Sequence, residues 1–168
     1  MSQPVGDPAS VSALGGALRT QAVRLADLAV DLSGQLSGAH RPTSRSEPTA
    51  HERALLERAA TELDRIGGLL QAWTATSVET AARARRLEPE LERADLVVDG
   101  HLVVEPPGPS RVDPATRASE RTRLQELLNR VTAVQSRELA RVRRELEQSR
   151  TSLAAVSLDA REGPAASA

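Results

Sequence analysis

The sequence predicts an all-α protein, an elongated antiparallel three-helix bundle with one small β-hairpin inserted before the last helix. Leucines and alanines recur at three- and four-residue steps through three long segments, and this is the spacing of one face of an α-helix. A short Val- and Leu-rich run on both sides of Asp99-Gly100 interrupts that spacing and has the pattern of two strands joined by a tight turn.

The first predicted helix covers about 8–38, after residues 1–6, which we expect to be flexible. Asp7-Pro8 begins it, because an Asp side chain can cap the free amides of a helix and Pro fits the first helical position. Its apolar stripe predicts one buried face, and includes Val11, Leu14, Leu18, Ala22, Leu25, Leu28 and Leu32.

The second predicted helix covers about 49–93 and completes a helical hairpin over 7–94. Pro89 lacks a backbone donor, so we expect a kink or an end near 86–88. The apolar stripe of this helix supplies the first group of candidate interaction residues: Leu56, Leu63, Ile66, Leu70 and Trp73.

The β-hairpin is predicted at 95–105. Asp99-Gly100 is expected to supply the positive φ angles of a two-residue turn. Pairing across that turn places Leu96, Val98, His101 and Val103 on one face and Val97, Leu102 and Val104 on the other. An isolated two-stranded hairpin is marginal in water, so we expect this one to lie on the helices or against a partner. Leu96, Val98 and Val103 are therefore further candidate interaction residues.

The third long helix is predicted at 113–157, where Asp113-Pro114 repeats the start signal of the first. A disordered tail is expected at 158–168. Five arginines share roughly one face of this helix, but Glu126, Glu138 and Glu145 interrupt them. The net charge is only −1, which favours a solvated face over a groove for nucleic acid.

The composition gives no support for catalysis or a cofactor. The chain has no Cys, and its three His fall at separate places in the pattern, so neither a thiolate site nor a metal-binding His pair is predicted. The carboxylates alternate with Arg at helical spacing, which is typical of solvated helix faces. We expect no enzyme, no cofactor, no metal and no small-molecule substrate.

The sequence also predicts a protein that does not insert into a membrane, since no window approaches 18 uninterrupted apolar residues. The N-terminus lacks the features of a conventional secretory signal.

The hydrophobic fraction of 39% comes mainly from Ala and Leu, with one Trp, no Phe and no Tyr. We expect these aliphatic stripes to be buried partly within the chain and partly across a dimer interface.

The Gly-Asp-Pro-Ala sequence at 6–9 opens an Ala-, Leu- and Arg-rich helix that turns into a second one, and this half of the chain resembles the WxG family of small helical-hairpin proteins in high-GC Gram-positive bacteria. The resemblance implies a homodimer, or a heterodimer with another helical hairpin, and export by type VII secretion without a cleaved signal. The Trp-x-Gly signature of that family is absent, because Trp73 is followed by Thr-Ala. The alternative is a cytoplasmic structural or adaptor protein of coiled-coil type, unrelated to secretion.

Overall fold

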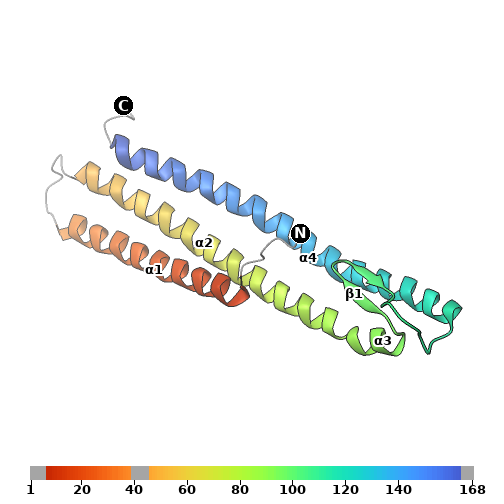
Figure 1. Ribbon diagram of the computed structural model, residues 1–168. Helices are drawn as coiled ribbons and strands as arrows, with labels where there is room; N and C mark the ends of the chain where they lie inside the picture. The colour runs from red at the N-terminus through yellow and green to blue at the C-terminus, as the bar shows by residue number, and fades with distance from the viewer. Residues whose placement is uncertain (1–6, 39–45, 164–168) are drawn as a thin grey trace. The chain divides into compact units, whose positions relative to one another are not determined.

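The computed structural model describes residues 7–38 and 46–163 (Figure 1). Its elements, in chain order, are α1 (Pro8–Gly38), α2 (Ser46–Arg85), α3 (Glu88–Arg93), β1 (Val97–Asp99), β2 (Leu102–Val104) and α4 (Pro114–Glu162). The chain is therefore mostly helical, with three long helices and a small antiparallel hairpin before the last one. This confirms the predicted fold class at that level, while the antiparallel bundle stays a prediction.

Several boundaries differ from the expected ones. The segment predicted as one helix at 49–93 forms two helices, because α2 begins earlier, at Ser46, and ends at Arg85 before α3 begins at Glu88. Pro89 explains the break, since it lacks an N–H and its ring would clash with the carbonyl of Arg85 in a continuous helix. α4 continues to Glu162, past the predicted end at 157. Residues 1–6, expected to be flexible, and 164–168 of the predicted tail lie outside the described residues.

The contacts divide the chain into two compact units. We call the first the hairpin unit, which contains Trp73–Ala140 and the chain up to Pro8. We call the second the helical unit, which contains Ala9–Ala72 and the chain from Arg141 onward. α2 and α4 each contribute one part to the hairpin unit and one part to the helical unit.

In the hairpin unit, a backbone motif turns the chain from α3 into β1. The Leu96 N–H donates to the Leu91 carbonyl at 2.9 Å, and the Asp95 N–H donates to the Glu92 carbonyl at 3.2 Å. Asp95 between them has a φ of 53°, in the left-handed region. These are the bonds of a Schellman C-cap, and its usual apolar contact is present because Leu91 and Leu96 are both buried.

The hairpin pairs Val97 with Val104, Val98 with Val103 and Asp99 with Leu102. Gly100-His101 is therefore the turn, and the predicted Asp99-Gly100 turn is wrong by one position. Gly100 has a φ of 60°, and neither Asp99 nor His101 has a positive φ, which is the pattern of a type II′ turn. This turn needs only one residue in the left-handed region, and Gly fills it without steric cost. Each β1 residue pairs with a residue two positions further along β2 than predicted. Because alternate residues of a strand share a face, the predicted division of the hairpin into two faces is unchanged.

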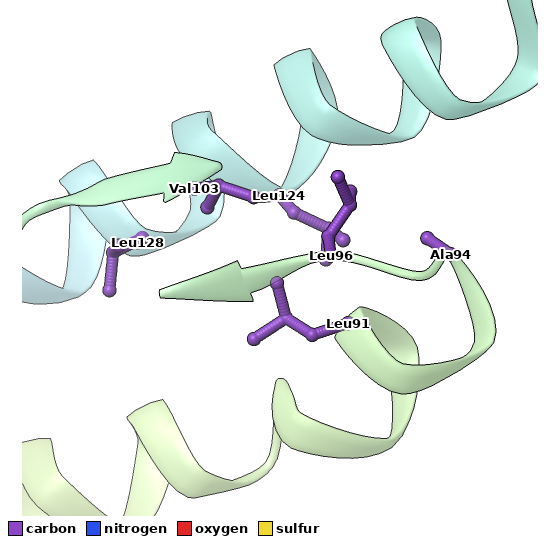
Figure 2. Close-up of a cluster of buried hydrophobic side chains, with 6 residues drawn as sticks. All are labelled: Leu91, Ala94, Leu96, Val103, Leu124 and Leu128. Carbon is purple, nitrogen blue, oxygen red and sulfur yellow. The ribbon is translucent and has the colours of Figure 1, made fainter. Parts of the chain in front are cut away.

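Figure 2 shows the buried cluster that holds the hairpin on the helices. Its side chains come from α3, the hairpin and α4, and Leu124 at its centre is fully buried. The cluster consists of Leu91, Ala94, Leu96, Val103, Leu124 and Leu128.

Polar contacts add to this attachment on the β2 side. Gln125 of α4 accepts a hydrogen bond from the Val103 N–H at 2.7 Å and donates one to the His101 carbonyl at 2.9 Å. Arg117 of α4 pairs with Glu105, just after β2, at 2.8 Å. The outer edge of β2 is thus bonded to α4.

In the helical unit, α1 and α2 approach closely because glycines face each other. A Cβ on Gly67 would lie 2.6 Å from the Gly15 carbonyl oxygen, and one on Gly15 would lie 2.9 Å from the Gly67 carbonyl oxygen. Ala22 and Ala29 of α1 and Ala60 of α2, which share these faces of the two helices, are also small and are buried. The two helices are antiparallel, since Arg19 bonds Asp64 and Ser33 bonds Arg53.

Against α4, the same part of α2 uses a different side. Arg58 pairs with Asp159 at 2.7 Å, and Arg65 donates to Gln148 at 3.1 Å. Every seventh residue of this part of α4 is buried: Val142, Ser149 and Val156. Within the helical unit, α2 therefore has α1 on one side and α4 on another (Figure 1).

Candidate functional site

No group of three or more His, Cys, Asp or Glu among the described residues is placed to hold a metal ion. None of the helices in that part of the chain is long and apolar enough to cross a membrane. Each unit instead carries an apolar surface that contacts within the unit leave partly exposed.

The predicted interaction residues of α2 are not in the buried core. Leu56, Leu63, Ile66 and Leu70, in the helical unit, are all half-buried, and so is Trp73 in the hairpin unit. The centre of the α1–α2 contact is occupied by Gly and Ala instead, and the leucines lie beside it. A contact through small residues brings the helix backbones together but leaves long side chains at its margin.

The predicted stripe of α1 divides in the same way. Ala22 is buried, whereas Leu14 is 54% exposed and Leu28 is 51% exposed. The buried face follows the heptad spacing of Gly15, Ala22 and Ala29, and of these three the predicted stripe contains only Ala22. At about 100° per residue, Leu14, Leu25, Leu28 and Leu32 lie within an arc of about 60° beside that small-residue face.

The ion pairs show on which side these leucines lie. Arg19 is on the opposite side of the Gly15-Ala22-Ala29 face from Leu14 and Leu28, and it bonds Asp64 of α2. The Arg19–Asp64 pair therefore marks the polar side of the α1–α2 contact. Leu56, Leu63 and Leu70 lie on the other side of α2, so the leucines of both helices face the same way.

The same argument extends to α4. Gln148 and Asp159, which bond α2, are on one side of the buried Val142-Ser149-Val156 face. Leu146 and Leu153 are on the other side and are half-buried. We call the combined surface of the helical unit the leucine face: Leu14, Leu25, Leu28, Leu32, Leu56, Leu63, Ile66, Leu70, Leu146 and Leu153.

Arginines border the leucine face on both sides. Arg24 of α1 and Arg143 of α4 are exposed, and neither has a carboxylate within salt-bridge distance in the described part of the chain. Arg150 lies on the same border of α4 and bonds Glu147 at 2.6 Å. The α1 border also carries the exposed Asp31, seven residues after Arg24, so Arg24 and Arg143 are the border cations without a carboxylate partner among the described residues.

The three candidate residues of the hairpin have different environments. Leu96 and Val103 are only 3% and 5% exposed and belong to the buried cluster. Val98, although it shares their face, is 43% exposed. Leu96 and Val103 thus attach the hairpin to the helices, and only Val98 is accessible to a partner.

Comparison of the chain with models of protein families, with curated proteins and with solved structures found no match. What the protein does is therefore inferred from its own surfaces.

Proposed function

We propose that the protein is a non-enzymatic interaction protein that binds an amphipathic helix of another protein on the leucine face. The observation that supports the proposal is that three helices turn leucines to one side and leave them exposed or half-buried, while small residues form the buried α1–α2 contact.

The energetic argument is that exposed leucine side chains gain free energy when a partner removes them from water. Burying a Leu side chain completely stabilises a protein or complex by roughly 1.5–3 kcal/mol relative to full exposure. A partner helix across the leucine face would remove Leu14 and Leu28 from water and complete the burial of the half-buried residues beside them. The product would resemble a four-helix bundle, with one helix supplied by the partner.

The charges indicate what kind of helix fits. Arg24 and Arg143 lie on opposite borders without a carboxylate partner among the described residues, and a partner helix with an acidic residue opposite each of them would pair with both. A second copy of this chain would bring arginine borders against each other. We therefore propose a heterodimer with another helical hairpin in preference to a homodimer.

The same surface serves a protein that stays in the cell as an adaptor and one that is exported with its partner by type VII secretion. These two possibilities differ in one observable. An exported protein appears in the culture medium only when the secretion ATPase is intact, and an adaptor is found in cells alone.

A synthetic helix tests the proposal. The probe is an amphipathic peptide of 28 residues with a leucine stripe and Glu on both flanks, and its control has Arg on both flanks. We expect the Glu-flanked helix to bind the full chain at least tenfold more tightly, measured by fluorescence anisotropy. Equal binding of the two peptides, or no binding of either, would contradict the charge argument.

Matched variants of α1 locate the surface. Leu28→Asp should weaken binding of the Glu-flanked helix at least tenfold. Val30→Asp is the control, because Val30 is 69% exposed and lies on the opposite side of the buried small-residue face. If both variants lose binding equally, the leucine face is not the site. Light scattering should show a monomer at tens of micromolar, and a dimer dispersed by Leu28→Asp would identify a second copy as the partner.

A further inference from the structure

The free edge of β1, in the hairpin unit, has backbone groups available for pairing. The Val103 N–H donates a hydrogen bond to the Gln125 side chain of α4, so this N–H points away from β1. In an antiparallel ladder, residues directly opposite each other both point their backbone groups inward or both point them outward. Val98, opposite Val103, must therefore point its N–H and C=O away from β2, toward the outer edge of β1.

An apolar groove of about 440 Å³ lies along that edge. Its walls come from the end of α2, from α3 and from β1, with Leu128 of α4 also contributing. The lining residues beside Val98 include Ala84, Leu87, Leu91, Leu96, Val97 and Leu128. A strand laid on the edge of β1 could thus place a side chain in an apolar groove while its backbone pairs with Val98.

The edge of β1 is short, at three residues, but it contains few of the features that block pairing. Exposed edge strands are commonly blocked by Pro, Lys or a bulge, because open N–H and C=O groups are a template for another strand. β1 has none of these three, its one charged residue is Asp99 at the turn, and Val97 and Val98 are 45% and 43% exposed.

Charge on the border of the groove restricts the occupant. Glu88 and Glu92 line the groove, are exposed, and have no cationic partner within salt-bridge distance among the described residues. Arg85 is the one basic residue that lines it. The acidic excess favours a peptide that carries Arg or Lys beside its apolar residues.

We propose that this groove binds an extended basic-apolar peptide, which adds a third strand to β1 through Val98 and inserts one aliphatic side chain among Leu87, Leu91 and Leu128. The site is separate in its residues from the leucine face, and it recognises a strand where the leucine face recognises a helix.

The probe that tests this is the peptide Arg-Val-Thr-Val-Arg-amide with fluorescein on its N-terminus, titrated with the full chain. Two further peptides carry N-methyl groups on the odd or on the even backbone nitrogens, which keeps side chains and charge but removes the donors of one edge. One of the two should bind at least tenfold more weakly than the unmethylated peptide. Equal binding of all three would exclude strand addition, and no binding of the parent peptide at 1 mM would overturn the proposal.

Variants of the groove complete the test. Ala84→Trp should fill the groove and weaken peptide binding at least tenfold, whereas Ala82→Trp, at an exposed α2 position outside the lining, should not. Glu88→Gln with Glu92→Gln should weaken binding of the basic peptide severalfold. Peptide binding that survives Ala84→Trp in a variant with an unchanged melting temperature would place the peptide elsewhere and overturn the proposal.

The test is independent of the proposed function. Leu28→Asp, which should weaken helix binding at least tenfold, should leave peptide binding unchanged. A chain that dimerises with rising concentration, and becomes a monomer on Ala84→Trp, would show that a second copy pairs with β1 and would contradict a peptide ligand.

Discussion

At the scale of single residues, the cap of α4 makes stability depend on pH. The Asp113 carboxylate accepts hydrogen bonds from the N–H groups of Thr116 and Ala115, at 3.0 and 3.1 Å. These bonds, that from Thr116 above all, hold the pKa of Asp113 below its ordinary value. A carboxyl group with a lowered folded pKa stabilises the protein above its unfolded pKa of about 3.9, and this contribution is lost as the pH falls through the folded value.

Asp113→Ala should therefore lower the melting temperature by a few degrees at pH 7, and the difference from the wild type should shrink below about pH 4. Thermal melts followed by circular dichroism at pH 7 and pH 3 measure it. Asp113→Asn is the control, because Asn also caps helices but does not titrate. A loss in Asp113→Ala that is as large at pH 3 as at pH 7 would show that the carboxylate is not the capping group.

The backbone conformation of Asp95 lowers the stability of the folded protein. Its φ of 53° puts a side chain into the left-handed region, where Gly is the favoured residue of a Schellman cap. Asp95→Gly should stabilise the protein by about 1 kcal/mol, and Asp95→Val should destabilise it by a similar or larger amount. Urea titration measures both. A destabilised Asp95→Gly variant would mean that the Asp side chain contributes a contact that outweighs its strain.

At the scale of elements, the two neighbouring glycines of α2 should respond in opposite ways to the same substitution. A Cβ at Gly67 would meet the Gly15 carbonyl and the Arg19 side chain, whereas a Cβ at Gly68 has nothing within 4 Å. Gly67→Ala should destabilise by about 1–3 kcal/mol through overpacking, and Gly68→Ala should stabilise by up to about 1 kcal/mol through helix propensity. Chemical denaturation compares them, and equal effects would mean that α1 and α2 are not in close contact at Gly67.

The elements also show how far sequence reasoning reaches. Helix starts at Pro8 and Pro114 follow from local chemistry, since an Asp cap and a Pro in the first turn act within a few residues. The turn of the hairpin was predicted one position too early, because Asp99-Gly100 and Gly100-His101 both offer a Gly and only the strand partners decide between them. Pro89 predicts a kink or an end near 86–88 within the segment expected as one helix, and α2 ends and α3 begins there.

At the scale of the whole molecule, the class was predictable and the packing was not. Leucine spacing identified helices, but it assigned Leu14 and Leu28 to a core that is built from Gly15, Ala22 and Ala29. Which face of a helix is buried depends on its neighbour, and a close glycine contact favours small residues over large ones. Of the candidate interaction residues, Leu96 and Val103 are core residues, and Val98 is accessible.

Folding and binding should separate along the leucine face. Leu63 is half-buried on α2, whose other sides contact α1 and α4, so Leu63→Asp places a charge where apolar contacts exist in the free protein. It should destabilise the chain by about 2 kcal/mol or more, seen as a lower melting temperature.

Leu28 is 51% exposed at the margin of the leucine face. Leu28→Asp should change stability by only about 0.5 kcal/mol and still weaken binding of the Glu-flanked helix at least tenfold. Because a ligand that binds only the folded state raises the melting temperature, that helix should stabilise the wild type more than Leu28→Asp. An unchanged melting curve for Leu63→Asp would show that the floor of the leucine face has been misassigned.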